Sequence, residues 1–82
     1  MNKMQYYGDK NIVHRRIKET RTAGKISQEE LAARMQSLNV NMDQQMISKI
    51  EKNNRIVTDY EVVCFAKALH VTVLYLLGIE EK

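Results

Sequence analysis

The sequence predicts an all-α fold in which five short helices form one compact domain. Three observations favour this fold class. The 82 residues include no proline and three glycines, and they are rich in residues with high helix propensity. Apolar residues recur at helical spacing. Ser, Thr and Asp stand at the positions where these periodic segments begin, as N-caps do. A chain of this size is sufficient for one small core.

The first predicted helix covers residues 11–23, with apolar residues on one side and cations on the other. Gly24 is expected to end it in the left-handed conformation. Residues 1–10 show no helical period, so they are expected to form a flexible N-terminal arm. The residues expected on the inner side of this helix are Ile12, Val13 and Ile17.

The second predicted helix begins at the segment SQEE. Ser27 would accept a hydrogen bond from a free backbone amide and Glu30 would reach back, as in a capping box. The asparagines of the segment NVN, residues 39–41, are typical of a turn. They should end the helix after one additional turn. The inward positions of this helix are Leu31, Met35 and Leu38.

The third predicted helix lies in the segment DQQMISKIEKNNR, which begins at Asp43. This aspartate is a good N-cap, and Asn53 tolerates the left-handed conformation at the exit. Ile47 and Ile50 stand one turn apart and should face the core. The helix is therefore expected to run to about Lys52.

Two more helices are predicted in the last third of the chain. The segment TDYE, residues 58–61, repeats the capping-box spacing and should open a fourth helix that ends near His70. Thr72 can cap a short fifth helix that ends at Gly78. Residues 79–82 would form a charged tail. The inward positions of the fourth helix are Val62, Phe65, Ala66 and Leu69.

The charges are distributed unevenly along the chain. The net charge is +3, but residues 1–57 carry eleven Lys and Arg against six Asp and Glu, which gives +5, whereas residues 58–82 carry two against four, which gives −2. A basic region of this kind favours a polyanion such as nucleic acid, although a solvated basic surface has the same composition.

Several classes of function are disfavoured by what the sequence contains. Cys64 is the only cysteine, which excludes an internal disulfide and suits a reducing cytoplasm. With His14 and His70 far apart, the sequence shows no zinc pattern and no nucleophile arrangement. No apolar run is long enough to span a membrane. We therefore expect no enzyme, metal site, cofactor, small-molecule ligand or membrane partner. Met35, Met42 and Met46 are interpreted as core or turn residues.

Four groups of residues occur in an order that is typical of one family: Ile17 with Arg21; Ser27, Gln28, Leu31 and Ala32; Ile47, Ser48, Ile50 and Glu51; and Ala68 with Leu69. Through these groups, over residues 12–78, the chain resembles the lambda-repressor-like helix-turn-helix domain of lambdoid phage repressors, Cro proteins and xenobiotic-response-element-type bacterial regulators. It departs from that pattern by an enlarged turn, residues 36–42, in which Gln36 replaces the usual glycine.

Base-reading residues are expected on the outer face of the third helix. If the two isoleucines pack inward, four polar residues lie at the N-terminal half of the helix on its outer side, and this half enters the major groove in a helix-turn-helix. A glutamine amide matches the edge of adenine, and lysine can reach guanine or phosphate. A solvated first turn is the alternative. The four residues are Gln44, Gln45, Ser48 and Lys49.

The resemblance also implies phosphate contacts and a structural ion pair. Gln28, at the start of the second helix, is similar to the phosphate-binding glutamine of the family. Asn54 and Arg55 are further candidates for phosphate contacts, with a solvated loop as the alternative. Arg21 and Glu51 resemble the internal ion pair that joins the first helix to the recognition helix.

The sequence thus predicts a sequence-specific, double-stranded-DNA-binding transcription regulator, a repressor of phage or mobile-element type that acts by promoter occlusion. A homodimer on a palindromic operator is expected, because the apolar residues 73–77 of the fifth helix cannot all face one core. The alternative is a protein-interaction module, such as an antitoxin-like or anti-repressor subunit with an acidic C-terminal part.

Overall fold

A computed structural model describes residues 7–81 of the chain, and within this part five helices form a single core, as predicted. No helix in this part is both long enough and apolar enough to cross a bilayer. The helices are α1 (His14–Ala23), α2 (Gln28–Ser37), α3 (Gln44–Glu51), α4 (Asp59–Leu69) and α5 (Val73–Leu76).

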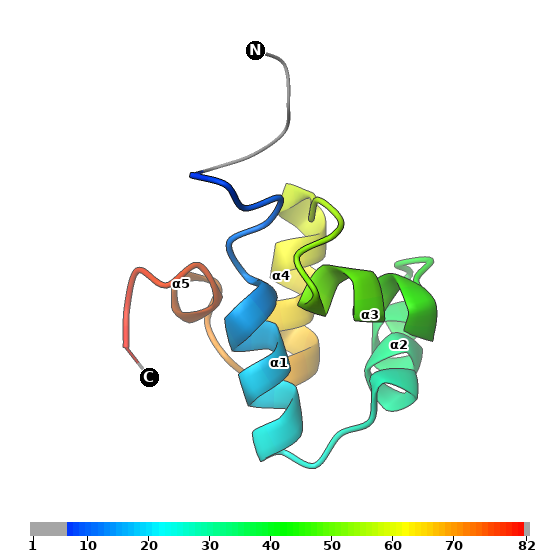
Figure 1. The fold of residues 1–82 in the computed structure, drawn as a ribbon. Coiled ribbons are helices and arrows are strands. Elements are labelled where there is room, and N and C mark those ends of the chain that lie inside the picture. The colour runs from blue at the N-terminus through cyan, green and yellow to red at the C-terminus, as the bar shows by residue number, and fades with distance from the viewer. Residues whose placement is uncertain (1–6, 82) are drawn as a thin grey trace.

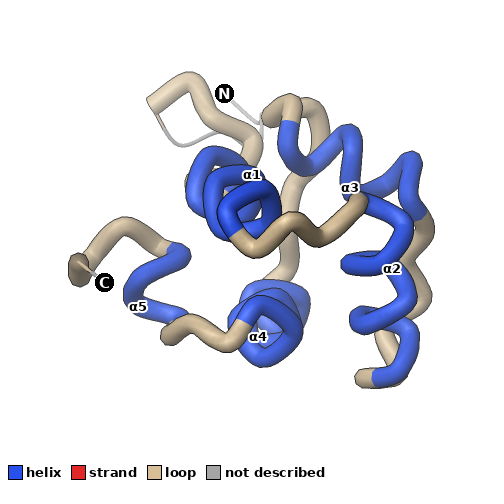
Figure 2. Tube along the Cα trace, turned by 90° about the horizontal axis from the view of Figure 1, so that it is seen from below, coloured by secondary structure: helices blue, strands red, loops and turns tan. Residues whose placement is uncertain are grey.

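The helices are arranged around a central pair. α1 and α4 occupy the middle of the molecule, α2 and α3 lie together on one side of them, and the short α5 lies on the other side (Figures 1 and 2). The contacts between elements agree, because α3 packs on α1 and α2 while α5 packs on α1 and α4. α1 and α4 therefore connect the pair α2 and α3 to α5.

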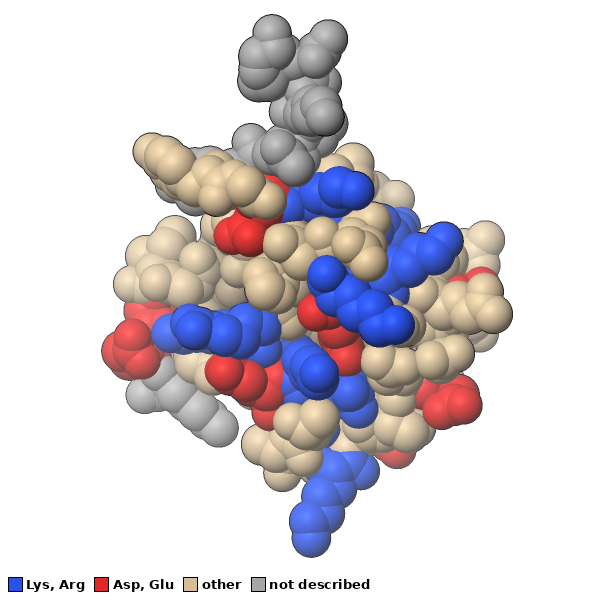
Figure 3. Space-filling model, viewed as in Figure 1, with Lys and Arg blue, Asp and Glu red and all other residues tan. Residues whose placement is uncertain are grey.

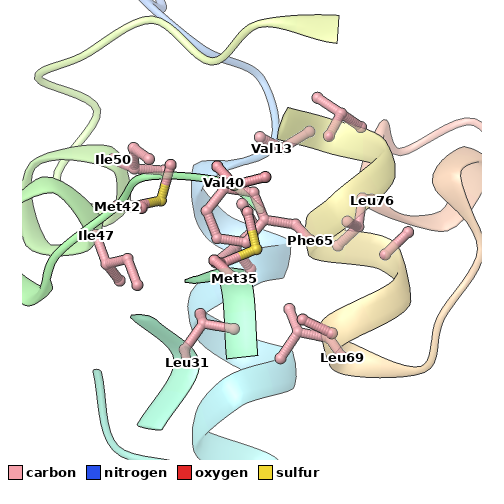
Figure 4. Close-up of a cluster of buried hydrophobic side chains, with 14 of the residues drawn as sticks. Val13, Leu31, Met35, Val40, Met42, Ile47, Ile50, Phe65, Leu69 and Leu76 are labelled. Atoms are coloured by element: carbon pink, nitrogen blue, oxygen red, sulfur yellow. The ribbon is translucent and has the colours of Figure 1, made fainter. Parts of the chain in front are cut away.

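Most of the apolar positions that the helical spacing predicted lie in the core, although Leu38 is only partly buried against it. Figure 4 shows Met35 and Phe65 near its centre, with Ile47 of α3 on one side and Leu76 of α5 on the other. Burying such side chains stabilises the fold by about 1.5–3 kcal/mol each. Fully buried side chains are contributed by all five helices and by the turn before α3: Val13, Ile17, Leu31, Met35, Met42, Ile47, Ile50, Phe65 and Leu76.

Most of the predicted helix starts are confirmed by their hydrogen bonds. Asp43, Thr58 and Thr72 each accept a hydrogen bond from a backbone amide of the first turn that follows. The capping box of α4 is complete, because the Glu61 carboxylate also accepts from the Thr58 amide at 3.0 Å. These contacts satisfy amides that would otherwise lack partners at a helix start.

The capping box predicted for α2 is only half formed. Ser27 accepts a hydrogen bond from the Glu30 amide at 2.9 Å, but the Glu30 side chain turns forward to Arg34, with 2.8 Å between carboxylate and guanidinium. Arg34 also donates to the carbonyl of Ala68 at the end of α4. The prediction that Glu30 reaches back was therefore wrong, because an arginine one turn ahead offers a charged partner.

Both ends of α1 differ from the prediction. The Asn11 side chain accepts a hydrogen bond from the Val13 amide, so the chain forms a turn there and the helix begins only at His14. Ile12 consequently lies outside the helix and is 40% exposed. At the other end, Gly24 is not left-handed; Lys25 takes that conformation instead, with φ of 58°.

Part of the predicted N-terminal arm is docked on the domain. Asn53, which has the expected left-handed φ, accepts hydrogen bonds from the amides of Lys10 and Asn11 and donates to Asp9. The side-chain amide of Asn11, through Nδ2, in turn donates to the carbonyls of Ile50 and Arg55. Residues 9–11 therefore lie against the exit of α3; residues 1–6 of the predicted arm lie outside the described part of the chain.

Lys25 and Asn53 provide a matched test of these two left-handed positions. Lys25→Gly should raise the free energy of unfolding by about 1 kcal/mol, because glycine adopts positive φ without the steric penalty of a Cβ atom. Asn53→Gly should lower it by about 1–3 kcal/mol, because the side-chain hydrogen bonds are lost. Urea denaturation of both variants measures this, and equal shifts of one sign would contradict the assignment.

Candidate nucleic-acid interface

The four predicted base-reading residues share the outer side of α3. Ile47 and Ile50 are fully buried, which fixes the rotation of the helix about its axis. The opposite side carries Gln45 and Lys49, which are exposed, and Gln44 and Ser48, which are partly exposed. The structure therefore brings the candidate readers together on one polar surface at the start and middle of α3.

The predicted ion pair between Arg21 and Glu51 forms beneath this surface. The Arg21 guanidinium meets the Glu51 carboxylate with two hydrogen bonds, Nε to Oε2 at 2.6 Å and Nη2 to Oε1 at 3.1 Å. The side chains are only 12% and 3% exposed. The hydrogen bond to Glu51 raises the pKa of Arg21 above its ordinary value, against the opposing effect of burial. The pair joins α1 to the end of α3.

Gln28 connects this buried pair to the first residue of α3. Its Nε2 atom donates to Oε1 of Glu51 at 3.0 Å, and its Oε1 atom accepts from Nε2 of Gln44 at 2.6 Å. A continuous chain of contacts thus runs from Arg21 through Glu51 and Gln28 to Gln44. The predicted phosphate contact of Gln28 would use its remaining N–H, because a glutamine amide has two donors.

The contact with Gln28 determines which atoms Gln44 presents outward. One N–H of its amide is used, which leaves the oxygen and a second N–H for another partner. An acceptor beside a donor is the pattern that complements N6 and N7 of adenine. Gln45 has an exposed side chain without a hydrogen bond inside residues 7–81, so both ends of its amide are available.

The structure assigns a structural contact to Arg55 that the sequence analysis missed. Its guanidinium pairs with the carboxylate of Glu61 through two hydrogen bonds, at 3.1 and 3.2 Å, and also donates to the Ile56 carbonyl. Asn54 beside it is exposed. The available signal was an arginine six residues before a capping glutamate. The phosphate contact of Arg55 stays a prediction, and this guanidinium already holds the start of α4.

The enlarged turn before α3 is anchored at several points. Val40 and Met42 are buried, and the side-chain amide of Gln36 donates to the Met42 carbonyl at 2.8 Å. Asn39 takes the left-handed conformation, with φ of 67°. α2 runs to Ser37, one residue short of the predicted end at Leu38, which caps it. The insertion therefore leaves the isoleucines of α3 in the core and the glutamines outside.

Basic side chains gather on the same face of the molecule. Figure 3 shows Lys and Arg over α1 and α3, with a few acidic side chains between them. Among residues 7–81, every exposed lysine or arginine except Lys67 precedes residue 58, as the charge distribution implied. The exposed cations before residue 58 are Lys10, Arg15, Lys18, Lys25, Lys49 and Lys52.

The other titratable side chains do not form a second site. His14 lies 3.8 Å from Asp9, His70 is exposed at the end of α4, and Cys64 is half-buried against the core. Within residues 7–81, no group of three His, Cys, Asp or Glu side chains could hold a metal ion. The arrangement on α3 is thus the main concentration of functional groups in this part of the chain.

Comparison with known proteins agrees with this geometry. A family model described as helix-turn-helix matches residues 17–76. The matched region contains the ion pair, Gln28, the whole of α3 and the α3–α4 connection. No match was found among curated proteins or among solved structures.

The buried pair can be tested by a double-mutant cycle. Glu51→Ala should lower the free energy of unfolding by roughly 1–4 kcal/mol, because Arg21 would keep a partly buried charge without its partner. The double variant with Arg21→Ala should lose less than the sum of the single variants. Thermal melts measure this, and Glu19→Ala, at an exposed position of α1, is the control. Additive losses would show that the pair is not coupled.

Acid should weaken the fold through Glu61. Burial alone raises the pKa of this carboxyl, but hydrogen bonds from Arg55 and Thr58 outweigh it, so the folded pKa lies below the ordinary value of 4.5. The ionised form therefore stabilises the fold above that pH, and the contribution disappears as the pH falls through the folded pKa. The stability difference between wild type and Glu61→Gln, measured by urea titration, should shrink below about pH 4.5. A difference that stays constant down to pH 3 would contradict this.

Proposed function

The chain belongs to the Cro/cI-type helix-turn-helix family of DNA-binding transcription regulators, and from this premise we propose that it is a sequence-specific repressor of phage or mobile-element type. One observation carries the proposal: Gln44 and Gln45 stand at the outer N-terminal turn of α3, and Gln44 is tied through Gln28 to the buried ion pair. A side chain held in this way is preorganised, so it loses little conformational freedom when it binds a base.

In the proposed complex the N-terminal half of α3 enters the major groove. Gln44 reads an adenine with its free oxygen and N–H, and Gln45 reads a neighbouring base. Ser48 and Lys49 follow one turn later, with Lys49 directed at guanine or at a phosphate. Gln28 and Asn54 contact phosphates on either side of the groove, and this fixes the position of the helix along the duplex.

A homodimer on a palindromic operator completes the proposal. At the end of the domain opposite α3, Leu74 and Ile79 are 46% and 68% exposed, while Leu76 is buried in the core. The exposed pair offers an apolar surface for a second copy. A two-fold axis there would place two recognition helices about 34 Å apart, one turn of DNA. A dimer bound in this way across a promoter would block transcription.

Selection of bound sites from random duplex DNA tests the proposal directly. The expected outcome is one enriched motif with two-fold symmetry and an adenine in each half-site. Enrichment of one unpaired half-site would refute the dimer, and no enrichment at all would refute sequence-specific reading. In that second case the exposed apolar residues of α4, Tyr60 and Val63, make a protein partner the next function to test.

Binding should weaken steeply as salt is added. Each subunit should release counterions from about four to six phosphates. The logarithm of the binding constant should then fall linearly with the logarithm of salt concentration, and this salt slope grows with the number of phosphate contacts. Lys49→Ala should reduce the magnitude of this slope by about one if the lysine contacts phosphate. Fluorescence anisotropy over a range of salt concentrations measures the slope, and Lys67→Ala, exposed on α4, is the control. A flat salt response would exclude the proposed phosphate contacts.

The two glutamines should affect specificity rather than general affinity. Gln44→Ala and Gln45→Ala should each weaken binding to the selected site by about 1–3 kcal/mol and leave binding to unrelated DNA almost unchanged. Competition experiments with the selected site and its single-base variants measure this. If both variants keep the wild-type ranking of sites, the glutamines form only a solvated first turn.

A further inference from the structure

The position of α5 depends on few contacts of its own. The helix has four residues, Val73–Leu76; Leu76 is its only fully buried side chain, and Val73 and Tyr75 are partly buried against the core. Such a short helix is not stable through its own backbone hydrogen bonds. The segment that follows it folds back, because the amides of Ile79 and Glu80 donate to the Leu74 carbonyl at 2.9 and 3.3 Å. The first of these bonds joins the backbone of the exposed Ile79 directly to that of the exposed Leu74.

A single side chain of α1 holds both ends of this folded segment. Nη1 of Arg16 donates to the carbonyl of Tyr75 at 2.9 Å and to the carbonyl of Glu80 at 3.0 Å. The guanidinium carbon lies 4.4 Å from the centre of the Tyr75 ring, and Nη2 lies 3.5 Å from the Glu81 carboxylate. The Arg16 side chain is only 15% exposed. Its two carbonyl partners, Tyr75 and Glu80, are the residues that directly follow Leu74 and Ile79.

Arginine is suited to this position in a way that lysine is not. A planar guanidinium can donate to two carbonyls and lie over a ring at the same time, whereas an ammonium is a point charge on a flexible stem. At the exit of α5 the Tyr75 carbonyl also accepts from the Gly78 amide at 3.0 Å, so Arg16 adds a second donor to it. Thr72, which caps α5, donates its hydroxyl to the Glu80 carboxylate and adds a contact within the segment.

We propose that Arg16 is the positioning residue of the dimer surface: by clamping residues 75–81 to α1, it fixes where Leu74 and Ile79 stand relative to the recognition helix. α5 and α3 lie on opposite sides of α1 (Figures 1 and 2), so α1 transmits the geometry of one to the other. Arg16 thereby determines which half-site spacing the dimer accepts. This inference rests on the proposed function, because it requires a dimer that binds DNA.

Arg16→Met tests the inference, with Arg15→Met as the matched control. Both changes remove one arginine of α1, but Arg15 is exposed and makes only a 3.9 Å ion pair with Glu19. Sedimentation gives the dimer dissociation constant, and binding to duplexes with one half-site shows whether the recognition surface is intact. Duplexes with two half-sites, at the selected spacing and at spacings changed by one or two base pairs, measure spacing preference.

Arg16→Met should weaken the dimer by about tenfold or more, equivalent to at least 1.4 kcal/mol, and should reduce the preference for one spacing. Binding to a single half-site should remain close to wild type, which a general loss of folding would not allow. Arg15→Met should keep the wild-type dimer and spacing preference. Arg16→Lys should resemble Arg16→Met, because it lacks the planar donor group.

The possible failures are distinguishable. Wild-type dimerisation and spacing preference in Arg16→Met would overturn the inference and leave the proposed function intact. Full rescue by Arg16→Lys would also overturn it, since a positive charge beside Glu81 would then be sufficient. A wild-type protein that selects single half-sites as a monomer would overturn both this inference and the proposed dimer, while base reading by α3 would stand.

Discussion

The candidate interface depends on one buried interaction, the ion pair of Arg21 and Glu51. Two charges in the interior are tolerated because each has several hydrogen-bond partners: Arg21 also donates to the Ile26 carbonyl, and Glu51 also accepts from Gln28. These additional contacts extend the pair into the connection between α1 and α2 and to the first residue of α2, Gln28, which in turn accepts from Gln44 in the first turn of α3. The same residues therefore stabilise the fold and orient Gln44. Changes at this pair should affect the stability of the fold and the proposed base reading together.

Two of the three arginines of α1 have different structural roles. Arg21 pairs with Glu51 on the side of α3, and Arg16 clamps the segment after α5 on the other side. Arg55 follows the same principle at a third place, where it holds the start of α4 through Glu61. Each guanidinium binds a carboxylate or carbonyl outside its own helix or loop, and the partners of Arg16 and Arg21 are remote in sequence. A small hydrophobic core is thus supplemented by charged contacts that specify how its short helices are oriented.

Local patterns in the sequence were sufficient for most of the fold. Helical spacing identified the buried faces, and Asp43, Thr58 and Thr72 marked three helix starts because capping acts within one turn. The start of α1 was misplaced because Ile12 has the right spacing, whereas the Asn11 side chain forms a turn that spacing does not reveal. The outer face of α3 followed from Ile47 and Ile50. The contacts of Gln28 and Arg16 could not be predicted, since they join distant segments, whereas Arg55 contacts Glu61 only six residues later and was missed.

The docking of residues 9–11 has a consequence for the order in which the chain can fold during translation. The side-chain amide of Asn11 donates to the Ile50 carbonyl, 39 residues later in the sequence, and to the Arg55 carbonyl, 44 residues later. The hydrogen bond of Arg16 to the Glu80 carbonyl can form only later still, because Glu80 is 64 residues away in the sequence. During translation, Asn11 and Arg16 are synthesised long before the residues that they bind. The N-terminal segment must therefore remain undocked while most of the domain is synthesised, and folding is completed only when the last helix emerges.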